Sequence, residues 1–434
     1  MTDELDGADG MGGANGTDEP ADGRDGRDGR DSVAEEGVAE EGRSPEAARR
    51  VPRRAVVITA VAAIAAVAAA ALLLVVLVPS WLRQSTSGNE AGPSKNPAGP
   101  SPVSSFGRQI GQPLTGHHGS VHAVALGRLG DRPIAVTGGK DRTARVWDLT
   151  THEQLGRPLT GHKGQVVTVA LGQLGDRPIA VTGGDDRTAR VWDLTTHEQL
   201  GRPLTGHTKG ITELAVGRLG DRAVAVTASW DGTVRIWDLA TREQLGRPLE
   251  HESGILSVAV DRLGDRPIAV TGQDNGLVLV WDLTTRKQLG QPLTAYAETA
   301  GAVAIGRLDD RPVALTGGLS CIAHVLDLTT REELGQPLSH EYEGMGAVAI
   351  GELDGRPIAI TECGDVRVWD LTTHQQLGEP LTDPSGKTVD ALAVAIGRLD
   401  DQPIAVTADS ADVRIWSLSD PPAPSPGNSV HHSE

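Results

Sequence analysis

The sequence predicts an all-β protein built from seven copies of a unit that contains four short strands. The first observation behind this prediction is a dipeptide, an aromatic residue followed by an acid, that recurs about every 45 residues, and such a period is typical of repeat architectures. The copies are Trp147-Asp148, Trp192-Asp193, Trp237-Asp238, Trp281-Asp282 and Trp369-Asp370, with Leu326-Asp327 and Trp416-Ser417 as weaker versions.

The second observation is the pattern inside each unit, which residues 155–193 show best. The runs VVTVALG, PIAVTGG and TARVWDL follow one another, and EQLGRPL comes next. Short β-branched runs separated by Gly, Pro and Asp are typical of antiparallel strands joined by tight turns. No stretch of the repeat region has a sustained helical period, so each unit is predicted to be one antiparallel sheet.

A Gly-His pair recurs in register with the aromatic–acid dipeptide, at Gly116-His117, Gly161-His162 and Gly206-His207. With both motifs in place, residues 107–419 resemble the WD40-repeat family. The resemblance implies a seven-bladed β-propeller with one four-stranded antiparallel sheet per blade.

The resemblance also implies a hydrogen-bonded network of His, Thr, Asp and Trp inside each blade, since a buried indole N–H needs an acceptor. The matching residues are His117, Thr137, Asp141 and Trp147, then His162, Thr182, Asp186 and Trp192, then His207, Thr227, Asp231 and Trp237. Unit four keeps His251, Thr271 and Trp281 but has Asn275 at the Asp place. Units five to seven depart further, with Tyr296 and Asp383 near the His place and Ser320, Cys363 and Ser410 near the Asp place. We therefore expect these blades to be less rigid or to be held by other means.

The order of strands predicts how the ring closes. The outer-strand pattern LGxPL follows units one to six, and a copy at residues 110–114 precedes unit one. No such run follows Trp416, so the last unit lacks an outer strand of its own. We expect the orphan strand around Ile110 to pair beside Ile415, which leaves no long unpaired sheet edge.

Three further segments flank the expected propeller, which spans 106–419. Residues 1–54 are rich in Gly, Asp and Glu and are predicted to be a disordered cytoplasmic tail, although a specific binding tail is an alternative. Residues 79–105 form a Pro/Gly/Ser-rich linker, and residues 420–434 form a flexible end whose paired histidines indicate no metal site.

Residues 55–78 contain no charge and are long enough for a transmembrane helix. A cleaved signal peptide is the alternative, but the preceding segment is very long and no small-x-small cleavage site follows. Arg49, Arg50, Arg53 and Arg54 lie on its N-terminal side, which predicts a cytoplasmic N-terminus and an extracytoplasmic propeller at the cell membrane.

Net charge, the balance of Arg and Lys, and the cysteines limit the classes of function that the chain can have. The net charge of −18 argues against nucleic-acid binding, which needs a basic face. The excess of Arg over Lys, with abundant Ala and Gly, suggests a bacterial source with a high GC content. The two cysteines, Cys321 and Cys363, are predicted to be free thiols, because a bond requires that they approach within about 7 Å.

No catalytic, cofactor or metal site is predicted. The first strand of each unit, which would line the central channel, is almost wholly apolar apart from Glu213 and Asp261. No nucleophile–base set or ligand cluster converges, and the recurring His-Thr-Asp sets are interpreted as structural. Asp274 and its neighbours hint at calcium but lack the other spaced ligands.

What remains is a binding surface for a protein partner, formed by residues that differ between units while the scaffold repeats. Trp230 is the most prominent, because exposed Trp side chains dominate interface energetics; packing on a neighbouring loop is the alternative. The candidates are Lys140, Lys163, Asp185, Lys209, Trp230, Glu252, Asp274, Tyr296 and Tyr342. The predicted function is a membrane-anchored, non-catalytic interaction platform. The alternatives are a sensor or enzyme that binds a small ligand or cell-wall fragment at the channel mouth, and a protein whose N-terminal tail carries the function.

Overall fold

The computed structural model describes residues 105–294, 299–340, 346–410 and 412–419. The predicted tail, the apolar segment 55–78, nearly all of the linker and the C-terminal end lie outside these ranges, as do Tyr296 and Tyr342. Within the described ranges no helix is long and apolar enough to cross a membrane.

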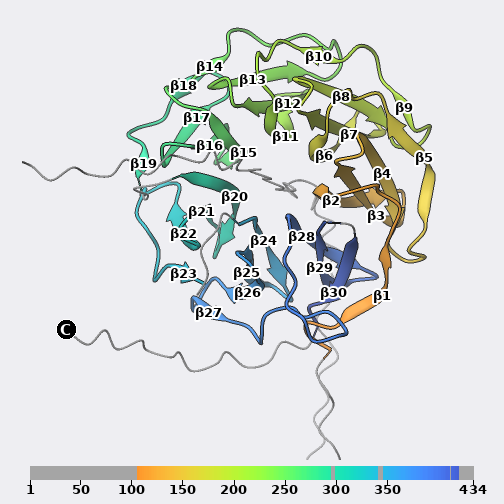
Figure 1. The fold of residues 1–434 in the computed structure, drawn as a ribbon. Helices are drawn as coiled ribbons and strands as arrows, with labels where there is room; N and C mark the ends of the chain where they lie inside the picture. Colours follow the sequence, from red (N-terminus) through yellow and green to blue (C-terminus); the bar gives the residue numbers. More distant parts are fainter. Residues whose placement is uncertain (1–104, 295–298, 341–345, 411, 420–434) are drawn as a thin grey trace, which may run out of the picture. The chain divides into compact units, whose positions relative to one another are not determined.

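The described residues form seven antiparallel sheets arranged as the blades of a ring (Figure 1). Blade one contains β2 (Val121–Leu129), β3 (Arg132–Gly139), β4 (Thr143–Asp148) and β5 (Gln154–Thr160). Blade two contains β6 (Val166–Leu174), β7 (Arg177–Gly184), β8 (Thr188–Asp193), β9 (Glu198–Gln199) and β10 (Leu204–Thr205). Blade three contains β11 (Ile211–Leu219), β12 (Arg222–Ser229), β13 (Thr233–Asp238) and β14 (Leu249–Glu250).

The other four blades repeat the same strand order. Blade four contains β15 (Ile255–Leu263), β16 (Arg266–Gln273), β17 (Leu277–Asp282), β18 (Lys287–Gln288) and β19 (Leu293–Thr294). Blade five contains β20 (Ala300–Leu308), β21 (Arg311–Gly318), β22 (Ile322–Asp327) and β23 (Leu338–Ser339). Blade six contains β24 (Val348–Leu353), β25 (Arg356–Glu362), β26 (Val366–Asp370) and β27 (Gln375–Gln376). Blade seven contains β28 (Ala393–Leu399), β29 (Gln402–Ala408), β30 (Val413–Ser417) and, from the other end of the chain, β1 (Gln109–Leu114).

The ring closes as the strand order predicts. Strand β1 pairs antiparallel with β30, and Ile110 lies opposite Ile415 in the register. Figure 1 shows the two strands side by side although they stand at opposite ends of the repeat region. The predictions of seven blades and of closure by the orphan strand are both confirmed, so the outermost edge of blade seven is covered.

Adjacent blades pack closely because the inner strands carry small and β-branched residues. Ala135 and Val136 on β3 have no exposed surface. A Cβ atom at Gly138 would lie 2.6 Å from Cγ1 of Val166 in the next blade, so only glycine permits this approach between the two blades. The apolar core is therefore divided among the interfaces between blades rather than gathered at one centre.

The acid of the Trp-Asp dipeptide ends the third strand. In blade one the carboxylate of Asp148 accepts hydrogen bonds from the N–H groups of Thr150 at 2.8 Å and Thr151 at 3.1 Å. Arg132 lies 3.2 Å from the same carboxylate. Such side-chain acceptors stabilise the turn that leads to the outer strand.

The outer strands are shorter than the LGxPL runs suggest. Blade one alone of blades one to six has a continuous outer strand of 7 residues; in blade two the run is split into β9 and β10. The glycine of the run takes a positive φ in both blades, +65° at Gly156 and +73° at Gly201, so this φ alone does not decide whether the strand is continuous.

Candidate partner-binding face

The networks implied by the resemblance are present in blades one to three, and blade three illustrates their geometry. The indole Nε1–H of Trp237 donates to Oγ1 of Thr227 at 2.9 Å, and Nε2 of His207 lies 2.8 Å from the same oxygen. Nδ1 of His207 lies 3.0 Å from Oδ2 of Asp231. Because a carboxylate only accepts, the imidazole donates from Nδ1 and accepts the threonine hydroxyl at Nε2. Blades one and two have the same contacts within 0.1 Å for the indole, imidazole and carboxylate bonds, at His117, Thr137, Asp141 and Trp147 and at His162, Thr182, Asp186 and Trp192.

The charges in these networks are fixed by their surroundings. Burial alone would raise the pKa of Asp231, but hydrogen bonds from Thr233, from the N–H of Thr208 and from His207 outweigh it and lower the pKa to about 2. Burial lowers the pKa of His207 despite the attraction of Asp231. At neutral pH the pair is therefore a carboxylate beside a neutral imidazole, which suits a structural contact.

Blade six has a complete network that the repeat register does not predict. His340 lies 2.7 Å from Asp365 and 2.6 Å from Oγ1 of Thr361, and the indole of Trp369 donates to Thr361 at 2.7 Å. The assignment of Cys363 to the Asp place in this unit was wrong. Thr361 precedes Trp369 by 8 residues, against 10 in blade three, so the shorter turn displaces the acid from the expected register. A Trp-centred search that allowed for turn length would have found it.

The remaining blades keep only parts of the network. In blade four Nε2 of His251 lies 3.0 Å from Thr271, while Nε1 of Trp281 has no hydrogen-bond partner among the described residues. Asn275 caps its own turn through the N–H of Leu277 at 3.2 Å rather than contacting His251. In blade seven the indole of Trp416 donates to Thr407 at 2.9 Å.

Blade five is held by a covalent bond, and the prediction of two free thiols was wrong. Cys321, in the turn between β21 and β22, forms a disulfide with Cys363, which follows β25 in blade six. Their Cα atoms are 5.8 Å apart, within the range that a disulfide requires. The sequence could not show this, because 42 residues separate the two cysteines and only the ring geometry brings the turns together.

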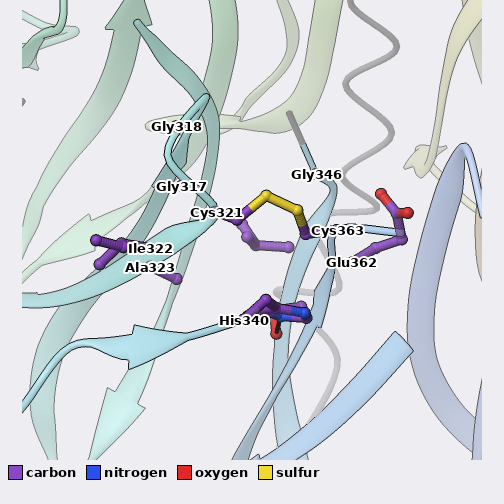
Figure 2. Close-up of a pocket in the computed structure, with 11 residues that line it drawn as sticks. Gly317, Gly318, Cys321, Ile322, Ala323, His340, Gly346, Glu362 and Cys363 are labelled. Atoms are coloured by element: carbon purple, nitrogen blue, oxygen red, sulfur yellow. Dashed lines mark hydrogen bonds between the residues drawn. A yellow bond between two sulfur atoms is a disulfide. The ribbon is translucent and has the colours of Figure 1, made fainter. Parts of the chain in front are cut away.

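A small cavity adjoins this disulfide (Figure 2). Its walls include Cys321, Cys363, His340 and Glu362. Figure 2 shows the carboxyl group of Glu362 directed away from the two sulfur atoms. Burial and the nearby charge of Asp390 raise the pKa of Glu362 to about 8, so the side chain is mainly neutral at pH 7.

The predicted partner-binding residues within the described ranges lie on one face of the ring. Lys140, Asp185, Trp230 and Asp274 each follow the second strand of their blade, and Lys163, Lys209 and Glu252 lie in the loops before the first strands. Antiparallel neighbours bring these two sets of loops to the same end of each sheet. Trp230 and Asp274 are half-buried, and the other five are exposed.

A polar chain joins blades one and two on this face. Nε2 of Gln165 donates to Oδ2 of Asp185 at 2.9 Å, and Nε2 of His122 lies 2.9 Å from Oε1 of Gln165. Neither Gln165 nor His122 belongs to a repeated motif, so no sequence pattern points to them. The side chain of Asp185 thus has a donor in its own blade.

The equivalent corner of blade four is arranged differently. Gly254 lies directly before the first strand of blade four, the place that Gln165 has in blade two. The carbonyl of Gly254 accepts the N–H of Asp274 at 3.0 Å, as the carbonyl of Gln165 accepts the N–H of Asp185. A Cβ atom at Gly254 would lie 2.9 Å from Cε3 of Trp230 and 3.2 Å from Oδ2 of Asp274. The indole therefore packs over the glycine of the neighbouring loop, as the alternative interpretation of Trp230 proposed, while part of the side chain remains exposed.

The two acidic residues predicted on the channel strands are not brought together. Glu213 is fully buried near the start of β11 and accepts the hydroxyl of Thr168 at 3.2 Å, whereas Asp261 is half-buried near the far end of β15. In the part of the chain that the structure describes, no group of three or more His, Cys, Asp or Glu side chains could hold a metal ion.

Comparison with known proteins agrees with the fold. The family model "WD domain, G-beta repeat" matches residues 107–148, 153–193 and 198–238, which are the first three units. No curated protein matches the chain. Residues 107–238 therefore carry three WD40 repeats, and the closed ring of seven antiparallel blades supports a WD40-repeat β-propeller.

Proposed function

We propose that this chain is a single-pass membrane protein whose propeller is a non-catalytic platform for protein partners in an extracytoplasmic, oxidising compartment. WD40 propellers commonly act as protein-interaction scaffolds. The observation that carries the proposal here is the contrast between a repeated scaffold and one face whose residues differ from blade to blade. Lys140, Asp185 and Trp230 occupy equivalent places yet differ in charge and size, and only Asp274 among the four repeats a residue of another blade. Such variation suits recognition of one irregular protein surface.

The disulfide supports the proposed compartment. Disulfides persist in oxidising environments and are rare where thiols are kept reduced. The bond between Cys321 and Cys363 joins two blades and is buried, as expected of a structural link. Together with the arginines that precede residues 55–78, it favours a propeller on the side of the membrane opposite the N-terminus.

Proximity labelling from the propeller in intact cells tests the platform. A variant with Lys140→Ala, Asp185→Ala, Lys209→Ala and Trp230→Ala should lose most labelled partners. The matched control changes Asp131, Asp176 and Asp221 to Ala, because these acids lie in turns at the opposite end of the same blades. Equal labelling by both variants, with melting temperatures like that of the unchanged protein, would contradict the proposal.

Sidedness has a separate test. Both native cysteines are bonded, so a cysteine introduced at the exposed Asp176 gives a single reactive thiol. A membrane-impermeant maleimide should label this residue in intact cells. Labelling that requires lysis would place the propeller in the cytoplasm and remove the extracytoplasmic part of the proposal.

A further inference from the structure

The corner between blades three and four combines a carboxylate that has one unpartnered oxygen with the face of an indole. Oδ1 of Asp274 is buried and has no hydrogen-bond partner among the described residues. An acceptor in this state is unfavourable until a donor reaches it. Beside it, the half-buried Trp230 packs across Gly254.

Blade two shows what blade four lacks. There the equivalent acid, Asp185, accepts a hydrogen bond from Gln165 at 2.9 Å. In blade four the equivalent of Gln165 is Gly254, which has no side chain to donate, and the neighbouring blade supplies Trp230 instead. Asp274 therefore has the indole of Trp230 beside it, where Asp185 has the side-chain donor of Gln165.

The pKa of Asp274 is consistent with a carboxylate that lacks a cationic partner. Burial raises the pKa of its carboxyl group, and the backbone N–H groups of Asp274 and Gly254 and the charge of Lys209 offset this only in part. No described cation lies within ion-pair distance of Asp274. An external cation that supplied a hydrogen bond would stabilise the ionised carboxylate.

The geometry points to this corner as the binding site for an arginine side chain of the protein partner, with the guanidinium bonded to Asp274 and stacked against Trp230. A planar guanidinium donates to a carboxylate and stacks on an aromatic face at the same time, whereas an ammonium group offers only a point charge. Residues 105–419 contain 30 Lys and Arg against 40 Asp and Glu, and this net charge of −10 on the propeller favours the approach of a cationic partner. This inference rests on the proposed platform function and names the chemistry of one of its contacts.

Equilibrium binding of a short labelled peptide to the full-length protein in a neutral detergent tests the inference. The probe is acetyl-Gly-Ser-Arg-Ser-Gly-amide with a fluorophore, and its partner probe carries citrulline, which is neutral but nearly the same shape as arginine. The arginine peptide should bind about tenfold more tightly than the citrulline peptide, measured by fluorescence anisotropy. Equal binding of both peptides, or no binding of the arginine peptide, overturns the inference.

Matched variants locate the site. Asp274→Asn should weaken binding of the arginine peptide by about tenfold, while Asp185→Asn, which changes the partnered acid at the same place in blade two, should leave it within about twofold. Gly254→Gln should act like Asp274→Asn, because it supplies the donor of blade two and displaces the indole. Trp230→Ala should weaken binding about threefold to fivefold. Equal losses in Asp274→Asn and Asp185→Asn would show general attraction to an acidic protein and overturn the site.

The melting temperature separates binding from folding. Asp274→Asn removes a partly buried negative charge whose Oδ1 has no partner among the described residues, so its melting temperature should be unchanged or higher. If Asp274→Asn unfolds the protein, Gly254→Gln decides the question, and retained binding in that variant overturns the inference. If proximity labelling of partners persists in Asp274→Asn but is lost in the variant with four alanines, the platform function is supported and the arginine site is contradicted.

Discussion

Blade three and blade five have the same strand order and the same register, but they are held together in different ways. Thr227 lies opposite Arg235 in blade three, and Thr316 lies opposite His324 at the equivalent place in blade five. Blade three has an indole, a hydroxyl, an imidazole and a carboxylate in one network. Blade five has Leu326 where the indole stands, and a disulfide to blade six.

The difference shows that the blade is specified by its backbone pairing and its apolar packing rather than by the polar network. Ala225 and Val226 in blade three and Ala314 and Leu315 in blade five are all fully buried at equivalent places. The same architecture therefore accommodates the network without the disulfide in blade three, the disulfide without the indole in blade five, and both in blade six. A covalent bond can replace a hydrogen-bonded network because each limits the separation of elements that packing already places together.

The strongest test of this comparison is removal of the disulfide. A variant with Cys321→Ser and Cys363→Ser should be less stable by about 4 kcal/mol, the loop-closure contribution expected for cysteines 42 residues apart. Thermal unfolding of the full-length protein without reductant should show a melting temperature lower by roughly 5–10 °C. A thiol reductant should lower the melting temperature of the unchanged protein and leave that of the variant unaltered. Equal melting temperatures would mean that packing alone holds blade five.

The second prediction concerns Glu362, which stands where blade one has Gly138. Its pKa is raised to about 8 from an ordinary value of 4.5, so the folded protein retains a proton that the unfolded chain releases. The contribution of Glu362 to the free energy of unfolding is therefore fully present below pH 4.5, and it is lost as the pH rises through about 8. Glu362→Gln should be more stable than the unchanged protein by roughly 4–5 kcal/mol above pH 8 and nearly equal to it near pH 4.5.

Denaturant unfolding at pH 5 and pH 8.5 measures this effect. Asp390→Asn is the matched variant, because the charge of Asp390 is the second cause of the raised pKa. It should reduce the pH dependence without abolishing it. A Glu362→Gln protein that loses stability between the two pH values as steeply as the unchanged protein would assign the dependence to another group.

Most of the fold could be predicted because its determinants repeat. The Trp-Asp and Gly-His motifs recur in register, and the orphan run around Ile110 shows which strand completes the last blade. What could not be predicted depends on contacts between units. The disulfide of Cys321 and Cys363 and the packing of Trp230 on Gly254 both cross from one blade to the next, and no local pattern records such a pairing.

The candidate site was predicted at the level of position but not of chemistry. Equivalence between units places Asp185 and Asp274 on the same face, and the structure confirms their equivalent places. Asp185 accepts a side-chain hydrogen bond whereas Oδ1 of Asp274 has no partner among the described residues, and this contrast depends on the difference between Gln165 and Gly254. The sequence shows that Gln165 and Gly254 differ, but only the side-chain contacts show how this changes the hydrogen bonding of the two acids.

The third prediction compares the two threonines directly. Thr227→Val preserves the volume of the side chain but leaves the indole N–H of Trp237 without its acceptor, so we expect a loss of about 2 kcal/mol in the free energy of unfolding. Thr316→Val should cost less, because Leu326 carries no N–H that needs an acceptor. Denaturant titration of the two variants gives the comparison. A larger loss for Thr316→Val would show that the blade-five hydroxyl has a structural role unrelated to the network.

The smallest expected effect comes from rebuilding the network of blade four. Burial lowers the pKa of His251 to about 4 from 6.5. Between these pH values the folded protein binds fewer protons than the unfolded chain, so the free energy of unfolding decreases as the pH falls from 6.5 to about 4. Asn275→Asp should place a carboxylate beside His251, as Asp231 lies beside His207, and raise the pKa of the imidazole. The variant should gain about 1 kcal/mol relative to the unchanged protein near pH 4.5, measured by denaturant unfolding, and little at pH 7.5. Asn275→Ala controls for loss of the cap on Leu277, and a gain by that variant equal to the gain from Asp would show that no new ion pair had formed.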